Sequence, residues 1–211
     1  MHHLILLGDS ILDNAAYTNG GPAVINHVRE QMPDGWHATL NAVDGATTED
    51  VYAQLAVLPE DASQLLLSVG GNNALLCGYV LDTPVTSTAD ALRLLSALAR
   101  DFELAYRRVV QACVDTTLPL VVCTIYHGNF PDPDYQQRAA VALTVFNDVI
   151  IRVAMEQRLR VIDLRSVCTS PGDYANPIEP SVQGGVKIAQ AIVRAVTEPA
   201  HSERGANLVG T

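Results

Sequence analysis

Positive charge, aromatic residues and long apolar runs are all scarce in this sequence. Its 211 residues include 13 Lys and Arg against 23 Asp and Glu, a formal charge of −10, and Lys187 is the only lysine. Proteins that bind nucleic acid or anionic membranes need a basic surface, so this balance argues against both kinds of partner. No apolar run reaches the roughly 20 residues that a membrane-spanning helix requires.

Cysteine is sparse as well, and its spacing marks no site. Four cysteines, Cys77, Cys113, Cys123 and Cys168, form no CxxC pair and have no zinc-type spacing to a histidine. We therefore expect free thiols, no metal and no cofactor. The apolar run near the amino terminus is too short for a signal peptide, so we expect a cytoplasmic protein.

Apolar residues are abundant, and their pattern predicts an α/β fold. Hydrophobic residues make up 48% of the chain and charged residues 17%, which excludes general disorder. Short apolar runs alternate with longer segments of helical periodicity, as in parallel strands that are buried on both faces of a three-layer α/β/α sandwich. The predicted strands cover residues 4–7, 37–41, 65–69, 120–125 and 161–164. We expect residues 1–200 to form one domain and residues 201–211 a flexible tail.

Helix-start signals support this alternation. Thr47 followed by Asp50 is similar to a capping box, with Thr47 as the N-cap. Ser87 opens a periodic segment that extends to about Asp115, and Pro133 opens another. The last helix is expected over residues 183–196.

Polar loops follow three of the predicted strands. Ser10 comes directly after the first strand in Gly8-Asp9-Ser10, Gly45 follows the second, and Gly70-Gly71-Asn72 follows the third. Ligands of open parallel sheets bind at the carboxyl ends of the strands, where these loops meet. Together they offer a serine nucleophile and three N–H donors, from the Ser10 backbone, the Gly45 backbone and the Asn72 side chain. This set satisfies the requirements for stabilising a tetrahedral oxyanion.

This order of motifs resembles the SGNH hydrolases, also called GDSL esterases and lipases, over nearly the whole chain. The resemblance implies a flavodoxin-like fold, with a five-stranded parallel sheet in the order 2-1-3-4-5. It also implies hydrolysis of acyl esters through an acyl-serine. Ser10 matches the family's nucleophile, and Gly45 and Asn72 match its oxyanion-hole positions.

The sequence departs from the family before the last helix. The family usually has Asp-x-x-His there, whereas this chain has Asn176 in the Asp place and Glu179 in the His place. Asn73 likewise stands where the family often has Asp. The usual base and the residue that orients it are therefore both missing.

Two residues are candidates for the missing base. Glu179 occupies the matching position, and its carboxylate can accept the proton of Ser10 if burial raises its pKa. His127 follows the fourth strand at the same edge of the sheet and has a suitable imidazole. His127 has an alternative role at the rim of the pocket, and Glu179 has one in holding backbone N–H groups. His2 and His3 precede the first strand, at the opposite edge, and are not candidates.

Two carboxylates near Ser10 are expected to support the site. Asp9 is expected to anchor the nucleophile loop by accepting backbone N–H bonds, and Asp13 either faces the pocket or caps the first helix. The favoured function is a serine esterase for small, acetyl-type esters. The alternative is a ligand-binding pseudo-hydrolase with little turnover. A carboxylate or imidazole within hydrogen-bond distance of the Ser10 hydroxyl would favour the esterase over the pseudo-hydrolase. The sequence contains no sign of the oligomeric state.

Overall fold

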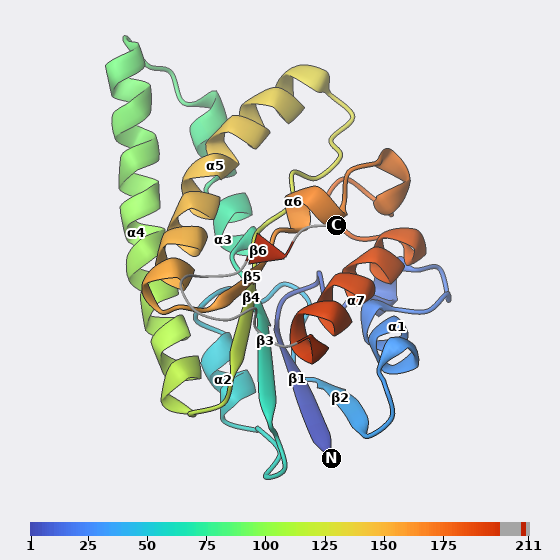
Figure 1. Cartoon of the computed structure of the whole chain (residues 1–211). Coiled ribbons are helices and arrows are strands. Elements are labelled where there is room, and N and C mark those ends of the chain that lie inside the picture. Colours follow the sequence, from blue (N-terminus) through green and yellow to red (C-terminus); the bar gives the residue numbers. More distant parts are fainter. Residues whose placement is uncertain (199–207, 210–211) are drawn as a thin grey trace.

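A computed structural model describes residues 1–198 and 208–209, with side chains for residues 1–198. Its centre is a parallel sheet in the order β2-β1-β3-β4-β5-β6 (Figure 1). The five expected strands and their order 2-1-3-4-5 are confirmed. Their bounds are β1 His2–Gly8, β2 Trp36–Leu40, β3 Gln64–Ser68, β4 Leu120–Cys123 and β5 Arg160–Ile162.

A sixth strand was not expected from the sequence. β6 (Leu208–Val209) pairs in parallel with β5 at the edge of the sheet. It falls within the segment expected to be a flexible tail, so that expectation does not hold for these two residues. The rest of the predicted tail lies outside the described residues.

Helices cover both faces of the sheet, as the three-layer expectation requires (Figure 1). Alternate side chains of β1 separate two cores. Leu4 and Leu6 pack in the core that includes α1, α6 and α7, whereas Ile5 and Leu7 pack in the core that includes α2, α4 and α5. The helices on the first face are α1 (Val24–Gln31), α6 (Leu164–Val167) and α7 (Val182–Thr197), and those on the second are α2 (Val51–Leu55), α4 (Thr88–Asp115) and α5 (Pro133–Glu156).

Short helical turns fill the connections at the carboxyl edge of the sheet. They are η1 (Ala15–Tyr17), α3 (Gly71–Leu76), η2 (Gly78–Asp82) and η3 (Pro171–Asp173). Within the described part of the chain, no helix has both the length and the apolar character needed to cross a membrane.

The expected helix starts are mostly confirmed. Ser87 accepts a hydrogen bond from the Asp90 N–H at the start of α4, and α5 begins at Pro133. The prediction for Thr47 as an N-cap is wrong, because α2 begins at Val51 and Asp50 is its N-cap. Thr47 instead donates from both its N–H and its hydroxyl to Asp50 Oδ2, at 2.7 and 2.8 Å. The sequence therefore indicated the correct pair of residues, but Asp50 accepts the hydrogen bonds and Thr47 donates them.

A side-chain amide fixes the end of β1. Gln54 is buried, its Oε1 accepts from the Gly8 N–H, and its Nε2 donates to the Gly8 carbonyl, both at 2.8 Å. Gly8 has a φ of 133°, and a β-carbon there would lie 1.8 Å from the Ser68 carbonyl oxygen. Only glycine therefore fits at this position, and the next residues along the chain start from a fixed point.

A second buried amide repeats this arrangement at the end of β4. Asn147 of α5 accepts from the Ile125 N–H and donates to the Ile125 carbonyl, both at 2.8 Å. Two of the strand ends that border the carboxyl edge are thus held by side chains from helices in addition to the pairing within the sheet. The loops that follow β1 and β4 therefore start from fixed positions.

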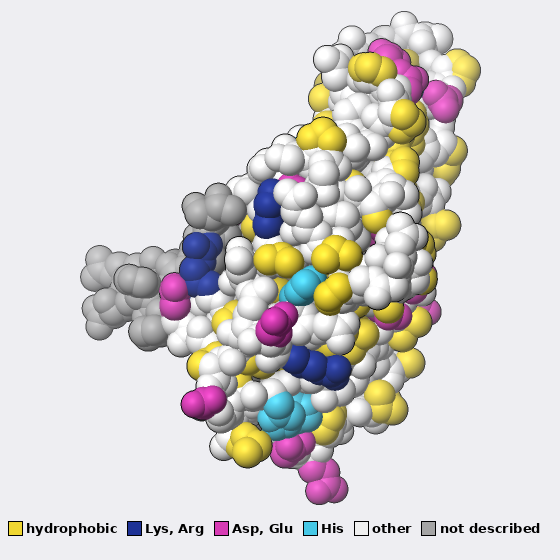
Figure 2. Space-filling view, turned by 90° about the vertical axis from the view of Figure 1, so that its right-hand side faces the viewer, with side chains coloured by type: hydrophobic (Ala, Val, Ile, Leu, Met, Phe, Trp, Pro, Cys, Tyr) yellow, Lys and Arg dark blue, Asp and Glu magenta, His cyan; other side chains and the backbone are white. Residues whose placement is uncertain are grey.

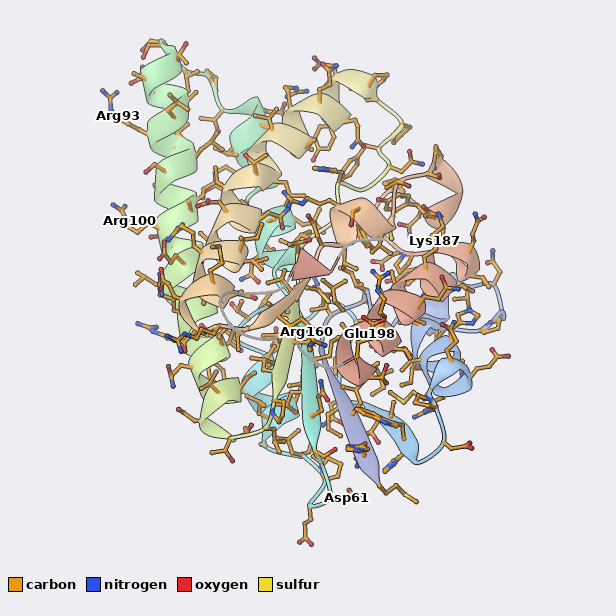
Figure 3. The ribbon with its side chains drawn as sticks, in the orientation of Figure 1. Asp61, Arg93, Arg100, Arg160, Lys187 and Glu198 are labelled. Carbon is orange, nitrogen blue, oxygen red and sulfur yellow. The ribbon has the colours of Figure 1, made fainter. Side chains whose placement is uncertain are left out.

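An ion pair anchors the segment that precedes α7. Asp173 is fully buried, and its carboxylate accepts from the N–H groups of Thr169 and Ser170, both at 3.0 Å. Lys187 of α7, labelled in Figure 3, approaches Asp173 Oδ1 to 2.7 Å. The only lysine of the sequence therefore ties this segment to α7.

Replacing Gln54 by alanine should destabilise the protein and displace the loop after β1. The Gly8 N–H would be left buried without an acceptor, which costs about 1–3 kcal/mol of unfolding free energy. Gln111→Ala, which removes an exposed amide on α4, is the matched control and should change stability by less than about 0.5 kcal/mol. Urea unfolding followed by circular dichroism measures both variants. Equal stabilities for the two would contradict the role given to Gln54.

Candidate active site

Four connections at the carboxyl edge of the sheet line one cavity. They contribute Asp9 and Ser10 after β1, Asn72 from α3, His127 after β4, and Glu179 before α7. These five residues were all singled out from the sequence. Gly45, Asp13, Asn73 and Asn176 were singled out too, but they do not line this cavity.

Ser10 and Glu179 lie in the same cavity. Both are buried, with 8% and 4% of their surface exposed. The pKa of the Glu179 carboxyl is raised from 4.5 to about 7. Burial is the largest cause, the hydrogen bond from Ser10 opposes it, and the charge of Asp44 adds to the rise. Glu179 Oε2 is buried and has no hydrogen-bond partner within the described chain, which is consistent with this desolvation. The arrangement pairs a hydroxyl with a carboxylate that ionises near neutral pH.

Asp9 is a second carboxyl group with a raised pKa in the cavity. Its Oδ1 accepts from the Ile11 N–H at 3.2 Å, which holds the nucleophile loop as expected. Its Oδ2 is buried and unpartnered among the described residues. Burial raises the pKa of Asp9 to about 7 against the effect of the Ile11 N–H, and the charge of Glu179 adds to the rise. Ionisation of Glu179 therefore favours the protonated form of Asp9.

The expected oxyanion donors are arranged around the loop after β2. Asn72 lines the cavity, and its Nδ2 donates to the Ala46 carbonyl at 2.9 Å, which fixes the direction of the amide. Gly45, next to Ala46, is exposed and has a φ of 81°. The N–H groups of Ser10 and Gly45 have no acceptor within residues 1–198. Two free backbone donors and one oriented amide thus lie at this edge.

Two of the supporting residues hold the loop after β2 instead of facing the cavity. Asp13 Oδ2 accepts from the Asp44 N–H at 3.0 Å. Asp13 therefore takes neither of the two roles considered for it, since it does not line the cavity and the N-cap residues of the first helical segments are Asn14 and Ala23. Asn73 accepts from the Thr48 N–H and donates to the Thr48 hydroxyl, both at 3.1 Å. These contacts connect the loop that carries Gly45 to the nucleophile loop and to α3.

Asn176 acts on the backbone around Glu179. Its Oδ1 accepts from the N–H groups of Ile178 and Glu179, both at 2.9 Å. Ser181, two residues beyond Glu179, caps α7 by accepting from the Gly184 N–H. In this structure the residue in the Asp place thus shapes a turn and makes no hydrogen bond to the Glu179 carboxylate.

Two residues that the sequence analysis did not assign flank Glu179. Asn14 is completely buried, and its Nδ2 donates to the Pro180 carbonyl at 3.1 Å. The Tyr126 hydroxyl donates to the Ile178 carbonyl at 2.6 Å. The peptide groups on both sides of Glu179 are therefore fixed from two other loops. The positions of these residues, after β1 and after β4, are the only sequence signal that could have indicated them.

His127 lines the cavity but makes no hydrogen bond to Ser10 or Glu179 within the described residues. Its Nδ1 is buried and has no hydrogen-bond partner within the described chain. Its backbone carbonyl accepts from Gln136 Nε2 at 3.3 Å. Of the two candidate bases, Glu179 is the one whose pKa is affected by a hydrogen bond from Ser10.

The remainder of the cavity is apolar. α3, η2, α4 and α5 line it with aliphatic side chains, among them Leu75, Val80, Leu95, Leu98, Ala142 and Leu143. Cys77 also lies there, but burial and the charge of Asp101 raise the pKa of its thiol, which disfavours the nucleophilic thiolate. The Ser10–Glu179 pair thus stands beside a hydrophobic recess.

Comparison with known proteins defines the class. The model of the GDSL-like lipase/acylhydrolase family matches residues 6–184. The chain therefore belongs to the GDSL-like lipase/acylhydrolase family. No curated protein sequence matches it.

Several solved structures share the fold. The extracellular lipase of Streptomyces rimosus has a TM-score of 0.68 at 15% identity, over 92% of this chain and 100% of that one. The Enterococcus faecalis lipase/acylhydrolase also has 0.68, at 21% identity over 96% and 100%. The Axe2 acetylxylan esterase of Geobacillus stearothermophilus has 0.64, at 17% identity over 96% and 97%. At these identities the likeness establishes the fold.

The titration of Glu179 should respond in opposite directions to two substitutions. Ser10→Ala removes the hydrogen bond that lowers the pKa of Glu179, so this pKa should rise above about 7. Asp44→Asn removes a charge that raises it, so the pKa should fall. Asp115→Asn, an exposed carboxylate at the end of α4, is the control and should leave it unchanged. Carbon-13 NMR of labelled glutamate carboxyl groups measures all three. Shifts in the same direction for the first two would contradict the assigned causes.

Proposed function

We propose that the protein is a serine esterase in which Ser10 is the nucleophile and Glu179 the general base. The observation that supports this proposal is that Ser10 and Glu179 are both buried and line the same cavity, where burial raises the pKa of the Glu179 carboxyl to about 7 and a hydrogen bond from Ser10 opposes the rise. General acid–base catalysis is most efficient when the pKa of the group lies near the working pH. An unperturbed glutamate would be too weak a base, and the observed burial removes that objection.

The proposed reaction begins with ionised Glu179. Ser10 Oγ attacks the acyl carbonyl carbon while its proton passes to the Glu179 carboxylate, and the carbonyl oxygen becomes an oxyanion. The N–H groups of Ser10 and Gly45 and the Asn72 amide donate to that oxyanion. Protonated Glu179 then donates its proton to the leaving alkoxide, and an alcohol departs from the acyl-serine.

Deacylation repeats these proton transfers with water. Glu179 accepts a proton from the water that attacks the acyl carbonyl carbon. The second tetrahedral intermediate then collapses with cleavage of the bond to Ser10 Oγ, protonated Glu179 returns its proton to Oγ, and the carboxylic acid departs. Asp9 is held close by as a carboxyl group that becomes easier to protonate when Glu179 is charged. Its neutral form keeps a second negative charge out of the cavity while Glu179 is ionised.

The shape and lining of the cavity support an acyl group larger than acetyl. Small esters were expected from the sequence because no apolar lid was evident. The aliphatic recess between α4, α5 and η2 offers an acyl chain a water-poor surface, and each buried methylene contributes about 0.8 kcal/mol. We propose that the substrates are esters whose acyl chain enters this recess.

Ser10→Ala should abolish reaction with a fluorophosphonate probe and hydrolysis of p-nitrophenyl esters. The substitution removes the only atom proposed to form the covalent bond, and it changes little volume. Mass spectrometry of the labelled wild type should locate the probe on Ser10, and Cys77→Ser is the control that should still be labelled. Labelling at another residue, or no hydrolysis by the wild type, would overturn the esterase proposal, and the latter result would favour a pseudo-hydrolase.

The identity of the base predicts both a pH profile and a pair of variants. Because only ionised Glu179 accepts a proton, kcat/KM should rise with pH through about 7. Glu179→Gln preserves the shape but removes the base, so kcat/KM should fall by about 10²–10⁴-fold. His127→Ala should cost only a few-fold. Measurement of kcat/KM for both variants from about pH 5 to 9 covers the proposed ionisation. A larger loss for His127→Ala than for Glu179→Gln would make His127 the base.

Blocking the recess should shorten the preferred acyl chain. Ala142 lines the cavity from α5, and Ala142→Phe should lower kcat/KM for p-nitrophenyl octanoate by at least about tenfold while the acetate ester changes little. Thr144→Phe, an exposed position on the same helix, is the matched control. Equal losses for both esters would show that the chain does not bind in this recess.

A further inference from the structure

Three metal-ligating side chains meet at the end of the sheet opposite the cavity. His3 on β1 and His37 on β2 are register partners in the parallel pair, and Asp61 lies in the turn before β3. Figure 3 labels Asp61 at the lower end of the sheet, and Figure 2 shows histidine side chains beside acidic ones at the same end. These residues are far apart in sequence, so their spacing along the chain gave no sign of the cluster.

We propose that His3, His37 and Asp61 bind one divalent transition-metal ion of the zinc type. One ligand atom from each residue lies within 4.8 Å of the other two. His3 Nδ1 is 2.8 Å from Asp61 Oδ1, and His37 Nε2 is 3.6 Å from Asp61 Oδ2. Ligand atoms around a tetrahedral zinc ion are about 3.3 Å apart, given bond lengths near 2.0–2.1 Å. The two observed separations, one to each oxygen of the Asp61 carboxylate, lie on either side of that value.

His3 is held in the orientation that a ligand needs. Its ring is almost completely buried, and its Nε2 lies 2.8 Å from the Thr39 hydroxyl. Its backbone N–H donates to Ser63 Oγ at 2.7 Å. The ion takes the place of the proton between His3 Nδ1 and Asp61 Oδ1, and His3 Nε2–H donates to Thr39. A hydrogen bond to the second ring nitrogen is the usual support of a metal-bound histidine.

The other two ligands have the freedom to complete the site. The side chains of His37 and Asp61 are 41% and 69% exposed, so both can move by the few tenths of an ångström that coordination requires. The His3 and His37 rings are stacked, with centroids 3.9 Å apart. Water fills the remaining positions, because the cluster supplies three protein ligands.

The chemistry of the ligands selects the class of ion. Two imidazoles and one carboxylate suit Zn²⁺, Co²⁺ or Ni²⁺ and are a poor match for Mg²⁺ or Ca²⁺, which prefer oxygen ligands. The formal charge of −10 also favours the binding of cations over anions. A bound ion would link the starts of β1 and β2 to the turn before β3. The site is independent of the proposed esterase reaction, which takes place at the other edge of the sheet.

Titration calorimetry with ZnCl₂ tests the site, on full-length protein that carries no polyhistidine tag. The wild type should bind one equivalent, and its thermal midpoint should rise with zinc. His37→Ala and Asp61→Asn should each weaken binding at least about tenfold, since each removes one of three ligands. Tetrahedral Co²⁺ absorption should appear in the wild type and be lost in both variants.

Two neighbouring substitutions are matched controls. His2→Ala changes the adjacent residue of β1, whose side chain points to the opposite face, and Glu60→Gln neutralises the carboxylate next to Asp61. Both should keep the affinity of the wild type. Absence of zinc binding by the wild type, or loss on His2→Ala with retention in His37→Ala, would overturn the proposal. Asp61→Asn should retain ester hydrolysis, which separates this test from that of the catalytic site.

Discussion

The close approach of β1 and β3 at Gly8 is the constraint on which the site depends. The two strands pair up to Gly8 and Ser68, and no side chain fits between them at that point. Gln54 then occupies both backbone groups of Gly8. Ser10 follows two residues later, so its position is set by the packing of the sheet. A loop alone would not hold a serine so firmly against a carboxylate from the far end of the chain.

Burial gives that carboxylate its chemical character. In water a glutamate would be fully ionised at neutral pH and would bind a proton too weakly to take one from a serine. In the cavity, desolvation raises the pKa of Glu179 to about 7. Three residues hold Glu179 in this buried position: Asn14 and Tyr126 bind the neighbouring peptide groups, and Asn176 binds the N–H groups of the turn. The family's histidine has an intrinsic pKa close to this value. In the proposed mechanism, this environment compensates for the replacement of histidine by glutamate.

Much of the fold followed from local patterns in the sequence, whereas the contacts of the site did not. Apolar runs predicted the strands because each strand is buried on both faces, and cap residues predicted the starts of α4 and α5. The family motifs indicated Ser10, Asn72 and Glu179, which do line one cavity. The role of Asp13, for which pocket lining and helix capping were both considered, was not predicted because its partner, the Asp44 N–H, belongs to a loop distant in sequence. The strand β6 and the cluster at His3 also depend on long-range pairing, which periodicity does not encode.

The Asp173–Lys187 ion pair has a consequence for the chemical labelling of this protein. Lys187 is the only lysine in the sequence, so apart from the chain terminus an amine-directed reagent has one side chain to acylate. That amine is held by Asp173, whose carboxylate also anchors the segment leading to Glu179. Its reactivity is consequently a single-site reporter of how often this segment separates from α7.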